Sequence, residues 1–218
     1  MTTTWESLLS EIRIDIQDNT ALVKSSDQTL YLFLKDAVRD YSRWVPQRVD
    51  RYGLTISGEY YPLPADFVDV VTVENPRDRY LEQYKGIPGR TFPQTGLPSL
   101  YYLSGNHLYL NGIARDGEGV FLTYLAIHAI PTDVDDIDFV FTIPEVDLEL
   151  IRLYVKAKVY SQIRTKTANL DRFTPGSKRR DDNPIEPEVD HLMAEYKVKI
   201  SERSAGGPVY LYRQGRVP

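Results

Sequence analysis

Apolar residues near the beginning of the chain recur every three or four positions, which is the periodicity of amphipathic helices. They form two stripes: Trp5, Leu8, Leu9, Ile12 and Ile16, and then Leu30, Phe33, Leu34, Ala37, Val38, Tyr41 and Trp44. Thr3 and Glu6 have the spacing of a capping box for the first helix. Ser26 can cap the second helix, and Pro46 ends it. This pattern predicts a helical hairpin over residues 1–48.

The last third of the chain shows the same periodicity. Its two stripes are Leu148, Ile151, Val155, Val159 and Ile163, and then Val189, Leu192, Met193, Tyr196 and Ile200. Pro144 suits the first turn of the earlier helix, and a polar loop over residues 166–184 separates it from a last helix over residues 187–203. Four amphipathic helices can share one core. We therefore expect a four-helix bundle built from residues 1–48 and 144–203.

Between the two helical regions the pattern changes to short β-branched or alternating runs separated by turn residues. The runs lie at residues 54–57, 67–73, 100–103, 107–110 and 120–127. Ser104-Gly105-Asn106 is a hairpin signal between two of them. Residues 86–98 hold three prolines and three glycines, which indicates a long loop. The fold class is thus expected to be α+β, with an antiparallel β-rich insertion over residues 49–143.

The C-terminal residues 204–218 form an unusually apolar tail. Gly206 and Gly207 allow a bend in the backbone, and Pro208 restricts the backbone geometry that follows. The residues after them include Val209, Tyr210, Leu211, Tyr212, Arg213 and Arg216. Valine and leucine alternate with the two tyrosines, so an extended tail can pair by its backbone with the sheet edge of a partner. The two arginines can meet acidic groups on that partner. The alternative is a tail that folds back on its own bundle.

Composition narrows the possible functions. The 218 residues carry a net charge of −5, whereas a general nucleic-acid binder is usually basic. The chain has no cysteine, which excludes disulfides, thiolate zinc sites and a cysteine nucleophile. No apolar run reaches the roughly 18 residues that a membrane span needs, and the first residues lack the pattern of a secretion signal. We expect neither a membrane location nor secretion.

Candidate chemistry is sparse. The three histidines, His107, His128 and His191, have no metal-ligand spacing; we expect the first two on strands and the last on a helix. The sequence contains no G-x-S-x-G, P-loop or dinucleotide fingerprint. The run over residues 133–138 has the first spacings of a calcium loop but lacks its glycine and its final glutamate. We therefore expect no enzyme activity, no cofactor and no metal.

Several segments together resemble the head-to-tail adaptor proteins of tailed bacteriophages, also called connector or head-completion proteins. The segments are Trp5-x-x-Leu8-Leu9-x-x-Ile12-Arg13, Asp27-Gln28-x-Leu30-x-x-Phe33-Leu34-x-x-Ala37-Val38-x-x-Tyr41-Ser42 and Tyr61-Pro62-Leu63-Pro64-Ala65-Asp66-Phe67 with Val70-x-x-Val73. The order of helices, β segment, helices and extended tail is similar as well. The resemblance covers most of the chain in organisation.

The resemblance implies a structural role in the virion. Adaptors of this kind form a ring, commonly of twelve copies, beneath the portal protein, and DNA passes through the ring without specific binding. They are assembled in the host cytoplasm and occupy the neck of the particle. The resemblance implies that residues 206–218 dock on the portal. Downstream tail or nozzle proteins would attach to the other side.

Two further surfaces follow from this interpretation. Subunit or tail contacts are expected at Tyr80, Tyr84, Tyr101 and Tyr102, because tyrosine suits interfacial positions. Seven acids and no basic residue lie between residues 133 and 150. Of these, Asp133, Asp135, Asp136 and Asp138 could face the DNA channel, where like charge would repel DNA. The alternative for this stretch is a solvated loop and an acid-rich helix start.

Other functions stay open at this point. A tail-tube or tail-terminator protein is possible, although such proteins are mostly β-sheet and this chain has four helical stripes. A regulator that binds DNA through the first two helices is another alternative, but the net negative charge of the chain argues against it. An enzyme with a scattered active site is a third alternative.

Overall fold

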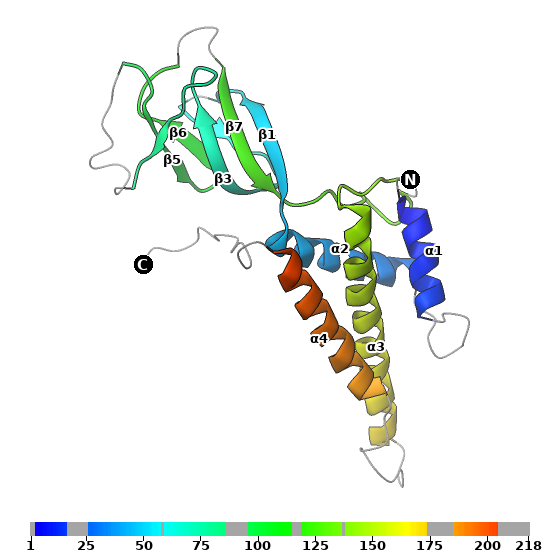
Figure 1. Ribbon diagram of the computed structural model, residues 1–218. Helices are drawn as coiled ribbons and strands as arrows, with labels where there is room; N and C mark the ends of the chain where they lie inside the picture. Colours follow the sequence, from blue (N-terminus) through cyan, green and yellow to red (C-terminus); the bar gives the residue numbers. More distant parts are fainter. Residues whose placement is uncertain are drawn as a thin grey trace. The chain divides into compact units, whose positions relative to one another are not determined.

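The computed structural model describes residues 3–16, 26–57, 59–85, 96–114, 119–136, 138–173 and 185–204, with backbone alone for residues 164–173 and 185–187. The chain divides into two compact units (Figure 1). The helical unit combines residues up to Val45 with those from His128 onward, and the β unit consists of residues Pro46–Ile127. The fold is therefore α+β, as the sequence predicts, and the β unit is an insertion between helices.

In the described part of the helical unit there are four α-helices. They are α1 (Trp5–Asp15), α2 (Asp27–Trp44), α3 (Leu148–Phe173) and α4 (Ile185–Arg203), and the short 3-10 helix η1 (Glu145–Asp147) leads into α3. All four predicted stripes lie on helices and turn inward, since their residues are buried or packed against the buried cluster. Some stripe residues, such as Phe33, Ile163 and Met193, are only partly buried and pack against the cluster.

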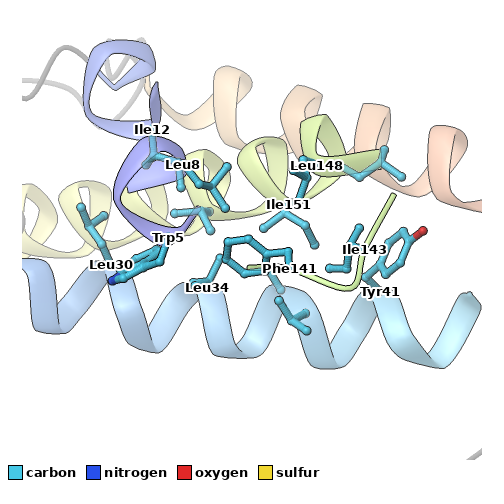
Figure 2. Packing of buried hydrophobic residues seen from close by; sticks show 14 of the residues in the cluster. Trp5, Leu8, Ile12, Leu30, Leu34, Tyr41, Phe141, Ile143, Leu148 and Ile151 are labelled. Atoms are coloured by element: carbon cyan, nitrogen blue, oxygen red, sulfur yellow. The ribbon is translucent and has the colours of Figure 1, made fainter. Parts of the chain in front are cut away.

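The core of the helical unit is filled from the two ends of the chain and from one connecting segment. Figure 2 shows Trp5, Leu8 and Ile12 of α1 beside Leu30 and Leu34 of α2, with Ile151 of α3 in the same cluster. Phe141 and Ile143, which precede η1, insert into the same cluster. The segment is also tied to α1, because the indole of Trp5 donates to the carbonyl of Val134 at 3.1 Å.

Helix α3 is central, and α1, α2 and α4 all pack against it. Figure 1 shows α2 running across α3 rather than alongside it. A bundle of four nearly parallel helices is therefore not confirmed. The shared core that the four stripes predict is present, but the crossing directions depend on side-chain shape and could not be read from periodicity.

Helix boundaries differ from the prediction at several places. Pro144 precedes the 3-10 helix η1 and not the first turn of α3, and α4 begins at Ile185 and not at residue 187. Thr4, not Thr3, caps α1: its hydroxyl accepts from the amide of Ser7 at 3.3 Å, and its own amide donates to the hydroxyl of Ser7 at 3.1 Å. Helix α3 continues to Phe173, so the polar loop predicted from residue 166 is wrong in its first part. Residues 166–173 contain no glycine or proline, and a polar segment of this kind can extend a helix beyond its packed stripe. Ser26 caps α2 as predicted.

The β unit contains seven strands among its described residues. The strands β1 (Gln47–Leu54), β7 (Val120–Ala126) and β3 (Phe67–Glu74) make one antiparallel sheet in this order. The strands β2 (Tyr61–Pro62), β6 (His107–Leu110), β5 (Leu100–Ser104) and β4 (Glu82–Gln83) make a second sheet, parallel only between β4 and β5. Side chains from both sheets share one core, which includes Val73, Tyr101, Leu108 and Leu122.

The predicted β5–β6 hairpin is confirmed, with Gly105 at a φ of +60° in its turn. The first strand was placed wrongly: it spans Gln47–Leu54 rather than residues 54–57. Strand β1 is an edge strand and exposes most of its side chains, so it lacks the alternation that marks a half-buried strand. The insertion ends at Ile127 rather than near 143, since Phe141 and Ile143 pack into the helical core.

Candidate interaction sites

The end of α4 is joined to two other elements of the helical unit through one buried carboxylate. Asp147 of η1 is only 6% exposed. Its Oδ2 accepts a 2.7 Å hydrogen bond from the hydroxyl of Tyr41 in α2. Its Oδ1 lies 3.0 Å from Nε of Arg203, an ion pair without hydrogen-bond geometry. The last helical residue before the C-terminal segment is thus held by a pair that also fixes α2.

Further polar contacts hold the preceding turns of α4. The hydroxyl of Tyr196 donates to Asp40 of α2 at 2.8 Å. Lys199 lies 2.7 Å from Glu149 of α3 and 2.9 Å from Glu195. The hydrogen bond and charge of Lys199 lower the pKa of Glu149, so this carboxylate is ionised at neutral pH. Together with Arg203, these contacts make the end of α4 a well-fixed point of departure for residues 205–218.

The acidic stretch separates into an exposed part and a structural part. Asp133, Asp135 and Asp138 are exposed. Asp133 accepts from the amide of Asp135 at 3.0 Å, and Asp136 accepts from the amide of Thr132 at 3.1 Å. Asp147 and Glu149 serve the internal contacts given above. The stretch is therefore not one solvated negative surface, and only the four residues before Phe139 stay candidates for such a surface.

Sequence reasoning missed the role of Asp147. A signal was present, because Asp147 lies four residues before Ile151 and therefore on the buried side of the helix start. An acid in a buried register needs a partner. That partner, Arg203, stands 56 positions later in the sequence, at a distance that periodicity does not reveal.

The tyrosines expected at a surface differ in exposure. Tyr80 is 62% exposed, and Tyr84 and Tyr102 are partly exposed. Tyr101 is buried in the core of the β unit at 5% exposure, and burial raises its pKa. Its ring is used within the subunit, because it alternates with Tyr102 on strand β5 and faces the other way. Surface contact is therefore left to the other three.

A row of aromatic side chains, of which the sequence singled out only Tyr102 as a contact residue, lies on the four-stranded sheet. Tyr102 and Tyr109 stack with ring centres 4.7 Å apart. Tyr60 meets His107 at 4.1 Å and Tyr109 at 6.0 Å. All four side chains, which we call the aromatic row, are partly exposed. The row follows from the register of β5 and β6, in which Tyr102 pairs with Tyr109.

A family model described as SU10 adaptor protein matches residues 3–183. The chain belongs to this family of phage head-to-tail adaptors. The match spans α1, α2, the whole β unit and α3, and stops before α4 begins. A search of curated proteins finds no match to the chain.

Family membership confirms the resemblance inferred from the sequence and implies a structural, non-enzymatic protein of the phage particle that contacts other virion proteins. The adaptor has no helix, among the residues described, that is long and apolar enough to cross a membrane. Within the same described ranges, no three potential ligand side chains gather as a metal site.

The residues expected to bind the portal lie outside the described part of the adaptor. They are Gly206, Gly207, Pro208, Val209, Tyr210, Leu211, Tyr212, Arg213 and Arg216. The nearest described residue is Ser204, whose amide donates to Ile200 at 3.1 Å. Of the histidines, His107 is on β6 and His191 on α4, as predicted. His128 is not on a strand; it follows β7 and is buried in the helical unit.

Proposed function

We propose that this adaptor forms a homo-oligomeric ring between the portal protein and the tail, with residues 206–218 docking on the portal. The ring is a dodecamer, extends the DNA channel, and offers its opposite side to tail or nozzle proteins. Family membership over residues 3–183 is the observation that carries the proposal. A tail-tube protein or a DNA-binding regulator has no comparable support.

The helical unit offers a firmly held helix end from which a docking segment can reach a partner. Tyr196, Lys199 and Arg203 hold the end of α4 to α2, α3 and η1. A docking segment that begins directly after such a fixed helix end loses less freedom on binding than one attached to a mobile stem. Pairing of an extended strand with a partner's sheet edge supplies affinity through backbone hydrogen bonds.

Ring closure needs two different, complementary surfaces on each copy. Tyr80, Tyr84 and Tyr102 are the aromatic candidates for such a contact, since aromatic side chains are enriched in interfaces. The exposed Asp133, Asp135 and Asp138, with Asp136, line the channel in this proposal. Their charge lowers the local concentration of DNA phosphates and lets DNA slide past without sticking.

The decisive experiment removes residues 206–218 and measures attachment to purified portal particles by co-sedimentation. The truncated adaptor should keep the circular dichroism and thermal unfolding of the full chain but should no longer sediment with the portal. A matched control replaces Arg48, an exposed residue of the β unit paired with Asp50, by alanine and should bind normally. Full attachment by the truncated adaptor would overturn the proposal.

Point variants separate the two parts of the contact. Replacing Tyr210 and Tyr212 by serine tests the apolar part, and replacing Arg213 and Arg216 by glutamine tests the charged part. Loss of the charged part should lower affinity more at low salt than at high salt. Equal loss at both salt concentrations would contradict a charged contact.

A further inference from the structure

His128 stands where the chain re-enters the helical unit. It is the first residue after the β unit, and Val45 is the last residue before it. The imidazole is buried, and its Nε2 lies 3.0 Å from the carbonyl oxygen of Val45. One side chain therefore joins the segment that leaves the helical unit to the segment that returns.

The partners of the ring assign its neutral form. The carbonyl of Val45 can only accept, so Nε2 carries the hydrogen. Nδ1 then accepts from the hydroxyl of Thr142 at 2.9 Å. The hydroxyl oxygen of Thr142 also accepts from the amide of Ala129 at 3.1 Å, and Ser42 accepts from the amide of His128 at 3.0 Å. Each polar atom around the neutral imidazole is satisfied.

A charged imidazole is disfavoured at this position. Burial lowers the pKa of His128 below its ordinary value of 6.5, and the bonds to Val45 and Thr142 oppose this only in part. The ring packs on Tyr41 of α2, which is uncharged, with ring centres 5.4 Å apart. Among the described residues, Asp147 of η1 is the acid whose charge acts on the ring, and Arg203 of α4 offsets that charge.

We propose that His128 is a pH-sensitive latch that holds the outgoing and returning segments together while neutral and releases them when protonated. A charged ring needs water, and the lowest-cost route to water is local opening at Val45 and residues 128–130, because Ala129 and Thr142 are already exposed. The packed stripes of α2 and α3 can stay closed. The latch is independent of portal docking and would stand without it.

The pH window follows from the sign of the shift. The pKa of His128 in the folded chain lies below the value of 6.5 in the unfolded chain. The contribution of the latch is therefore complete above about pH 6.5 and is lost as the pH falls below it.

The test measures hydrogen exchange of the amides of His128 and Ala129 in the full chain at pH 7.5 and pH 5, each corrected for intrinsic exchange. Protection should be lower at pH 5 than at pH 7.5, because the open state binds the proton more tightly than the closed state does. His128→Gln stays neutral and can still donate to Val45, so its protection should not change with pH. His191→Gln, at an exposed histidine of α4, should behave like the native chain.

Three results would overturn the latch. Ring titration by NMR could place the pKa of His128 at or above 6.5. His128→Gln could lose protection as the native chain does, which would assign the effect to another group. The amide of Ile151 in α3 could lose protection in parallel, which would mean acid unfolding of the whole unit. If His128→Gln does not fold, the ring titration and the comparison with Ile151 still decide.

Discussion

The hydroxyl of Tyr41 donates a 2.7 Å hydrogen bond to the carboxylate of Asp147, which is 106 positions away in the sequence. Both side chains are buried. The bond links α2 to the start of α3, so the two halves of the helical unit meet at a polar contact inside an apolar core. A buried carboxylate that loses a donor keeps its full desolvation cost.

Tyr41→Phe is expected to lower the free energy of unfolding by about 1–3 kcal/mol, because it leaves Oδ2 of Asp147 without its donor. Urea denaturation followed by circular dichroism measures the change. Tyr80→Phe is the matched control: Tyr80 is 62% exposed, and its change should stay within about 0.5 kcal/mol. Equal effects at both positions would show that the hydrogen bond contributes nothing.

Arg203→Ala should cost more in a Tyr41→Phe background than in the native chain. In the double variant Asp147 is buried with neither its donor nor its cation, whereas each single variant keeps one of them. Since Arg203 is about half exposed, we expect a coupling of about 0.5–1 kcal/mol, at the low end of the range for neighbouring residues. A double-mutant cycle of unfolding free energies measures it, and simple additivity would contradict it.

The free energy of unfolding should fall steeply as the pH rises above about 10. Burial raises the pKa of Tyr196 and Tyr41, and hydrogen bonds to Asp40 and Asp147 raise them further. Burial and Asp66 raise the pKa of Tyr124 to about 12. These tyrosines stay neutral in the folded chain, whereas the unfolded chain releases their protons near pH 10. Their contribution is therefore complete below about pH 10 and is lost above it.

Unfolding free energies measured between about pH 9 and pH 11 test this expectation. Tyr196→Phe cannot ionise, so its stability should decline less steeply with pH than that of the native chain. A parallel decline in the two proteins would show that Tyr196 ionises normally in the folded state.

Gly105→Ala should destabilise the β unit by about 1 kcal/mol, since an L-residue at positive φ is strained by about 1–2 kcal/mol. A Cβ at Gly105 would meet no atom within 4 Å, so the cost is conformational and not steric. Gly53 is the control: a Cβ there also meets nothing, and its φ is ordinary, so Gly53→Ala should be neutral or slightly stabilising. Similar losses of unfolding free energy at both glycines would contradict an effect of the positive φ.

The helices could be predicted from the sequence because a stripe such as Leu30, Leu34 and Val38 is a local property of the chain. Each residue lies on the same side of the helix as its neighbours three or four positions away, whatever the stripe later packs against. The hairpin at Gly105 was predictable for the same reason, since a two-residue turn involves adjacent residues only. Strand β1 was missed because an exposed edge strand carries no alternation to detect.

Tertiary structure alone decided the contacts between distant residues. Asp147 contacts Tyr41 and Arg203, which are distant in the sequence. His128 contacts Val45 and Thr142, and no local sequence pattern connects either pair. It also decided that Tyr101 is buried while Tyr102 is not, because the face of a strand that meets the core is set by the sheet packed against it. Local periodicity therefore determined where helices and hairpins form. The long-range packing of those elements determined which polar groups are buried, and these groups then required partners.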